Sequence, residues 1–133
     1  MTPNLHAIDH LVLTVRDIRA TVAFYVGTLG MEEETFRPAD GTTRTALTFG
    51  AQKINLHQKG NEFEPKAAQP VPGSADLCFL TEMSLEKWIT HLNQKNISII
   101  EGPVARTGAQ GPMSSIYIRD PDQNLIEIAI CTR

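Results

Sequence analysis

The stretch "IDHLVLTV" (residues 8–15) alternates bulky aliphatic side chains with other side chains, which is the pattern of a β-strand with one buried face. Asp17 follows this strand, where its carboxylate predicts the cap of a helix that runs to about Leu29. Gly30 stands where a helix commonly ends in a left-handed residue. Three short strands are predicted next, over residues 33–37, 43–49 and 53–58.

The second half of the chain repeats this order of elements. The stretch "ADLCFLTE" (residues 75–82) predicts a strand, and Ser84 predicts the cap of a helix that ends near Asn96. Further strands are predicted over residues 97–101, 113–119 and 125–131. The sequence therefore contains an internal βαβββ repeat with a period of about 66 residues.

This repeat predicts an α+β fold built from two βαβββ modules. One four-stranded sheet with one helix leaves a sheet face uncovered, so we expect a cupped mixed β-sheet with the helices on its outer face. The expected organisation is a single domain over residues 1–133, with module one at about 5–58, a proline-rich linker at about 59–74 and module two at about 75–133. A linker of this length also allows modules to be exchanged between the chains of a dimer.

Composition narrows the classes of function. The 133 residues are 41% hydrophobic with a net charge of -3, and the scattered charges give no basic face for nucleic acid. No apolar stretch is long enough to cross a membrane, and the N-terminus lacks an apolar signal core, so we expect no cleaved export signal. Cys78 and Cys131 lie in apolar runs and are expected to be reduced and buried, which favours a cytoplasmic location.

Four polar side chains fall at matching positions of the repeat. His10 matches Asp76 in the first strands, and aligning "NLH" (55–57) with "LIE" (125–127) matches His57 with Glu127. Each of them lies on the strand face opposite the bulky aliphatic side chains. A carboxylate such as Glu127 is costly to bury without a partner, and a divalent cation is an efficient partner.

The residue types in this set predict a metal site of catalytic type. Two histidines with one or two carboxylates suit Zn, Ni, Co, Mn or Fe as a divalent ion, and the absence of cysteine ligands argues against a structural zinc site. Asp76 is open to three interpretations: a direct ligand, a partner that orients a histidine, or a residue that only starts its strand.

Three segments carry a resemblance to a known family. "IDHLVLTVRDI", "FYVGTLGM" and "RDPDQNLIEI" resemble the signature segments of the glyoxalase, or vicinal oxygen chelate, superfamily. Nearly the whole chain is similar to the group called glyoxalase domain-containing protein five, including "QKINLHQKG", "EFEPKAAQPVPGS" and "GPVARTGAQGPMSSIYIRDPDQNLIE". The resemblance implies the glyoxalase/bleomycin-resistance fold, small-molecule substrates and a homodimer.

The resemblance also implies metal ligands on the first and fourth strands of each module. Those positions are His10, His57, Asp76 and Glu127, whereas bacterial glyoxalase I has histidine, glutamate, histidine and glutamate in that order. The family theme is chelation of neighbouring substrate oxygens by an open metal, with a carboxylate moving a proton between adjacent carbons. Glu127 is the first candidate for this catalytic carboxylate, and Asp76 is the second.

The implied function is a divalent-metal-dependent lyase or isomerase, similar to lactoylglutathione lyase, that acts on a small carbonyl compound or its adduct with a thiol co-substrate. The alternatives are an extradiol-type dioxygenase with His10, His57 and Glu127 around Fe²⁺, a thiol transferase, or a non-catalytic small-molecule-binding protein. Arg106 in the loop "ARTGAQGP" (105–112) and Arg44 are weaker candidates for contacts with an anionic substrate group.

Overall fold

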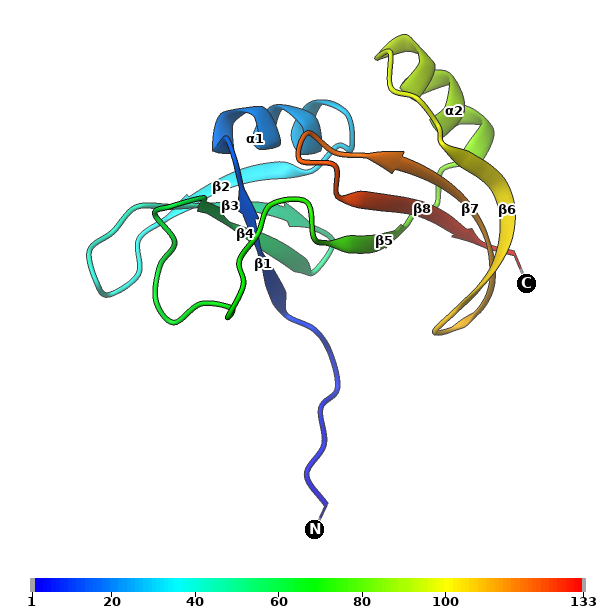
Figure 1. The fold of residues 1–133 in the computed structure, drawn as a ribbon. Helices are drawn as coiled ribbons and strands as arrows, with labels where there is room; N and C mark the ends of the chain where they lie inside the picture. The colour runs from blue at the N-terminus through cyan, green and yellow to red at the C-terminus, as the bar shows by residue number, and fades with distance from the viewer. Residues whose placement is uncertain (1, 133) are drawn as a thin grey trace. The chain divides into compact units, whose positions relative to one another are not determined.

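The structure is a computed structural model that describes residues 2–132. The chain divides into two compact units, the first ending at Val71 and the second beginning at Pro72. Each unit has the predicted βαβββ order, with one helix and a four-stranded mixed sheet (Figure 1). The predicted α+β class with two modules is therefore confirmed.

Unit 1 contains one helix, α1 (Ile18–Gly27), and a sheet with the strand order β1-β4-β3-β2. Its outer pair, β1 and β4, is parallel, and the remaining pairs are antiparallel. The strands of unit 1 are β1 (His10–Val15), β2 (Glu32–Phe36), β3 (Arg44–Phe49) and β4 (Gln52–Gln58).

Unit 2 repeats this topology with α2 (Leu85–Gln94) and the strand order β5-β8-β7-β6. Here β5 and β8 are the parallel pair. The strands of unit 2 are β5 (Asp76–Leu80), β6 (Glu101–Gly108), β7 (Gly111–Arg119) and β8 (Leu125–Cys131).

The helix starts agree with the sequence prediction, and α1 ends at Gly27, two residues before the predicted Leu29. Asp17 accepts a hydrogen bond from the Ala20 amide at 3.2 Å, and Ser84 accepts one from the Lys87 amide at 3.2 Å. Both side chains satisfy amides that lack a partner inside the helix. Asn96 has a φ of 59°, the left-handed conformation expected where α2 ends. Among residues 2–132, no helix has the length and apolar character that a membrane crossing requires.

The segment after α2 differs from the prediction. A strand was expected over residues 97–101 and a loop over 105–112, but β6 runs from Glu101 to Gly108 and forms a hairpin with β7 (Figure 1). In the sequence, Gly102-Pro103 indicates the end of a strand. However, β6 is an edge strand whose register shifts between Glu101 and Val104, and proline and glycine are tolerated at such a position.

The sheet of unit 2 has one buried aliphatic face and one mixed face. Ile116, Ile118, Ile126 and Ile128 are at most 2% exposed and share one face of β7 and β8 by alternation. The opposite face of β8 carries Glu127. This alternation agrees with the sequence prediction and places Glu127 away from the aliphatic core.

A buried polar turn sets the start of β8. The two carboxylate oxygens of Asp120 accept hydrogen bonds from the amides of Asp122 and Asn124 and from the Asn124 side chain, at 2.8 to 3.0 Å. The Asn124 side-chain oxygen accepts a hydrogen bond from the Ala75 amide at 2.9 Å. These bonds tie the start of β8 to the start of β5, and so fix which residues of the two strands lie side by side.

Candidate functional site

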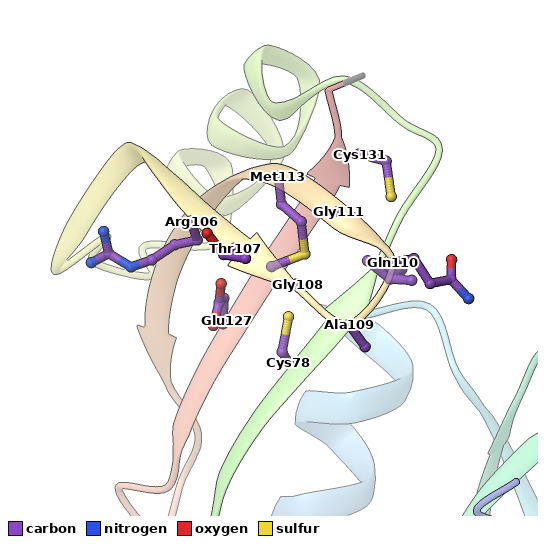
Figure 2. Close-up of a pocket in the computed structure, with 11 residues that line it drawn as sticks. Cys78, Arg106, Thr107, Gly108, Ala109, Gln110, Gly111, Met113, Glu127 and Cys131 are labelled. Atoms are coloured by element: carbon purple, nitrogen blue, oxygen red, sulfur yellow. The ribbon is translucent and has the colours of Figure 1, made fainter.

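The mixed face of unit 2 contains a pocket of about 380 Å³. Side chains of β5, β7 and β8 form its walls together with the tip of the β6–β7 hairpin (Figure 2). The lining is mainly apolar, with one carboxylate, that of Glu127. A pocket that is mostly apolar with a few polar groups is typical of small-molecule sites, whose volumes are about 300–1,000 Å³.

Glu127 lies in the middle of β8, beside Cys78 of β5 and opposite Tyr117 of β7. Its Oε2 accepts a hydrogen bond from the Ser115 hydroxyl at 2.5 Å. Ser115 is fully buried, so this bond fixes the carboxylate against a rigid part of the sheet. An ionised carboxylate has about four acceptor positions, so Glu127 keeps capacity for a ligand.

Cys78 is the second polar group at the base of the pocket. The thiol is partly desolvated in the pocket although the residue is exposed, and this desolvation, the negative charge of Glu127 and a hydrogen bond to that carboxylate together raise the pKa of the Cys78 thiol to about 11. The group is therefore a neutral thiol at physiological pH and donates its hydrogen to Glu127. The expectation that both cysteines are buried is wrong, because Cys78 and Cys131 are exposed and their sulfur atoms belong to the pocket wall.

Arg106 lines the same pocket from β6, but its guanidinium is occupied. Nε donates to the Tyr117 hydroxyl at 2.8 Å, and the other two nitrogens donate to the Ala105 carbonyl at 3.0 Å and to Glu101 at 3.2 Å. In Figure 2 the guanidinium points away from Cys78. These contacts hold the side chain at the edge of the pocket.

In unit 1, His10 is half exposed at the start of β1. Its Nδ1 lies 2.8 Å from Asp9 Oδ2, and since a carboxylate only accepts, Nδ1 is the donor in this contact. Nε2 is then the nitrogen available to a ligand. Histidines that bind metals usually donate their other ring N–H to a carboxylate in this way.

His57 has different surroundings from those of His10. It is only 6% exposed, and its ring meets the ring of Phe63 edge-on with 5.3 Å between centroids. The Arg44 guanidinium lies 3.9 Å from the centroid of the same Phe63 ring and is paired with Asp40 at 2.7 Å. Burial, and then the charge of Arg44, lower the pKa of His57.

The strand register corrects the repeat alignment used to pair the polar residues. In unit 1, His10 pairs with Lys53 and His57 with Thr14; in unit 2, Asp76 pairs with Leu125 and Cys78 with Glu127. The counterpart of Glu127 is therefore Asn55, so the predicted match of His57 with Glu127 is wrong by two residues.

The register also sets the spacing of the candidate ligands inside each unit. His10 and His57 share a face but lie four register positions apart, about 13 Å along the strands, and Asn55 lies between them. In unit 2, Asp76 is exposed and two positions before the Cys78–Glu127 pair. Across residues 2–132, no three His, Cys, Asp or Glu side chains form a group that could hold a metal ion.

The sequence model of the Glyoxalase/Bleomycin resistance protein/Dioxygenase superfamily matches residues 7–128. The chain belongs to this superfamily. The family predicted from the signature segments is thus confirmed.

Relatives within the superfamily cover nearly the whole chain. A virulence protein of Salmonella typhimurium, STM3117, is 59% identical over 122 residues, which make up 92% of this chain and 82% of that protein. The glyoxalase domain-containing protein RDO1 of Mycosarcoma maydis is 53% identical over 126 residues, 95% of this chain and 69% of that protein. The solved structure of an integron cassette protein from Vibrio cholerae matches with a TM-score of 0.93 and 52% identity, covering 99% and 100% of the two chains.

Sequence reasoning missed three residues of this pocket. Ser115 and Cys78 contact Glu127 from neighbouring strands, and Met113 forms a pocket wall. Alternation places Ser115 and Met113 on one face of the strand predicted over residues 113–119, which is the only signal that the sequence carries for them. Their contact with Glu127 and the pocket depends on pairing between strands, which alternation does not reveal.

We expect the buried His57 to make stability depend on pH. Its pKa in the folded protein lies below the unfolded value of 6.5, so the unfolded chain takes up the proton first as the pH falls. The free energy of unfolding should therefore have its full value above pH 6.5. It should decrease as the pH falls from 6.5 through the pKa of His57 in the folded protein. Urea unfolding with EDTA present, at several values between pH 8 and pH 5, measures this decrease.

The His57→Gln variant should lose part of that decrease, since glutamine does not titrate. His6→Gln is the matched control because His6 is exposed, and it should keep the wild-type pH dependence. An unchanged pH dependence in His57→Gln would show that the buried ring does not cause the effect.

Proposed function

We propose that this protein is a divalent-metal-dependent glyoxalase-like enzyme, a lyase or isomerase that acts on a small carbonyl compound or its thiol adduct. The observation that carries the proposal is the placement of Glu127. It is a carboxylate inside a mainly apolar pocket, oriented by the Ser115 hydroxyl and the Cys78 thiol and still able to accept a proton.

The chemistry of several donors supports the metal part of the proposal. His10 presents a free Nε2 and has Asp9 as its orienting partner. The buried side-chain oxygen of Asn55 has no hydrogen-bond partner within residues 2–132, which is unfavourable unless something binds it. The proposed ligands are His10, Asp76 and Glu127, with Asn55 as an added oxygen donor; His57 is left out because it lies four register positions from His10, about 13 Å along the strands. Such nitrogen and oxygen donors suit Zn, Ni, Co, Mn or Fe.

The mechanism assigns separate tasks to the chain's own residues. A bound metal ion would supply Lewis-acid polarisation of the substrate carbonyl. Glu127 takes the proton from the carbon beside that carbonyl and returns it to the neighbouring carbon. Ser115 holds Oε2 of the carboxylate during this transfer. Arg106 and Arg44, expected from the sequence to contact an anionic substrate group, are instead paired with Glu101 at 3.2 Å and Asp40 at 2.7 Å, so neither is assigned to the substrate.

A second candidate function is a small-molecule-binding protein without catalysis. The mainly apolar pocket favours it, and so does the finding that residues 2–132 contain no group of three metal-ligating side chains. The two candidates differ in one measurable property, the bound metal.

Metal analysis of anaerobically purified protein tests the proposal. We expect a stoichiometric divalent ion, and conversion of the methylglyoxal–glutathione adduct or a related 2-oxo compound by protein loaded with each metal in turn. His10→Ala should lose the ion, and His6→Ala, a matched substitution of an exposed histidine, should keep it. Wild-type protein without metal would favour the binding protein, and equal occupancy in both variants would show that His10 is not a ligand.

The proposal also includes the oligomeric state, the co-substrate and the location: we expect a homodimer, a thiol co-substrate and a cytoplasmic enzyme. Light scattering of the full-length chain measures the first, and comparison of turnover with and without glutathione measures the second. Activity on the free carbonyl compound alone would contradict the need for a thiol.

A further inference from the structure

The unit 2 pocket has three sulfur atoms in its wall. Cys78, Met113 and Cys131 contribute them from three neighbouring strands. Figure 2 shows the Met113 and Cys78 sulfur atoms pointing toward each other, with the Glu127 carboxylate beside them. Thiols and thioethers are polarisable and make favourable contacts with aromatic rings. The wall chemistry therefore favours an aromatic ligand over a saturated one of the same size.

The position of the Met113 thioether is fixed by the hairpin. Met113 is only 8% exposed, although methionine is a flexible side chain. A Cβ at Gly108 would lie 2.6 Å from the Met113 sulfur, so the thioether packs directly against the glycine backbone. The sulfur is thus held in place before a ligand arrives, which reduces the entropy lost on binding.

The polar groups of the pocket define the ligand's charge. Glu127 offers acceptor positions beyond those used by Ser115 and Cys78, and its negative charge disfavours an anion. Arg106 does not offset that charge inside the pocket, because its guanidinium is held by Tyr117, Glu101 and a backbone carbonyl. A neutral or cationic hydrogen-bond donor is the group that fits.

A large apolar side chain at the pocket also calls for a ligand. Leu80 is 58% exposed although it lies in a strand, and it lines the pocket. A ring that covers Leu80 removes apolar surface from water, which is favourable. Leu80 and the sulfur atoms therefore favour an aromatic ring, and the Glu127 carboxylate favours a hydrogen-bond donor on that ring.

We propose that this pocket binds a flat aromatic molecule carrying one hydroxyl or amino group, with the ring against the sulfur atoms of Cys78 and Met113 and the donor on Glu127. The inference goes beyond the proposed function: it concerns the same pocket, but it requires neither turnover nor a pair of chelating oxygens. Binding and catalysis can therefore fail separately.

NMR of protein labelled with ¹³C at the methionine methyl groups tests the proposal, because one of the four methionines lies in the pocket. The probes are 2-naphthol, 2-naphthoate and decahydro-2-naphthol, applied to the protein as purified and after EDTA treatment. We expect 2-naphthol to move the Met113 methyl signal upfield by its ring current and to leave the Met31 and Met83 signals in place. The naphthoate and the saturated alcohol should bind several-fold more weakly.

Two variants examine the role of sulfur. Met113→Leu keeps a similar volume and removes the thioether, so it should reduce the preference for 2-naphthol over the saturated alcohol. Met83→Leu, at a methionine outside the pocket, should leave that preference unchanged. Equal binding of the two alcohols, tighter binding of the naphthoate, or no shift at Met113 would each overturn the proposal. Metal content and turnover, measured separately, would still report on the enzyme proposal.

Discussion

Turnover should fall by about 10²–10⁴-fold when Glu127 is replaced by glutamine, because general base catalysis contributes about that much and an amide cannot take up the substrate proton. Glutamine has nearly the same shape and still accepts the Ser115 hydrogen bond, so the fold and the pocket should persist. The measurement is kcat with the carbonyl substrate found in the metal-loaded screen. Circular dichroism establishes that the variant is folded.

Glu86→Gln is the control for this substitution. Glu86 lies in the first turn of α2, outside the pocket, so loss of its charge should leave kcat unchanged. Cys78→Ser keeps a donor beside Glu127 and should have a much smaller effect than Glu127→Gln. If Glu127→Gln keeps full activity with its metal bound, then another group moves the proton and the assignment of the base is wrong.

The sequence predicts the fold well because fold information is local in this chain. Alternation identifies most strands, and the side chains of Asp17 and Ser84 identify both helix starts. The exception is β6, an edge strand with little apolar alternation. It tolerates Gly102-Pro103 near its start, where the register with β7 shifts. Edge strands lack the pattern that burial imposes on central strands, and so their bounds are the hardest to predict.

The site was less predictable because it depends on pairing between strands. A shift of one residue moves every side chain to the other face, but a shift of two residues keeps the face unchanged. Alternation therefore does not distinguish His57 from Asn55 as the counterpart of Glu127, and only the register does so. The same holds for Ser115 and Cys78, whose contacts with Glu127 come from neighbouring strands.

Gly102→Ala is the substitution expected to destabilise unit 2 most. Gly102 has a φ of 107°, and an added Cβ would lie 2.3 Å from the Ser115 carbonyl oxygen and 2.9 Å from the Ile116 Cα. Backbone strain and the clash each cost about 1–3 kcal/mol, so the free energy of unfolding should drop by about 3 kcal/mol or more. Trp88, the single tryptophan and a residue of α2, reports the unfolding of unit 2 by fluorescence.

Gly111→Ala separates the clash from the backbone strain. Gly111 has a φ of 129°, but no heavy atom lies within 4 Å of an added Cβ, so only the strain of about 1–3 kcal/mol applies. Equal losses in the two variants would mean that β7 moves away freely from Gly102. A larger loss in Gly102→Ala would show that the backbone at Ser115 is held rigidly, which is the condition for its hydroxyl to orient Glu127. The contact between Gly102 and the Ser115 backbone thus tests whether Ser115 is held firmly enough to orient the proposed base, Glu127.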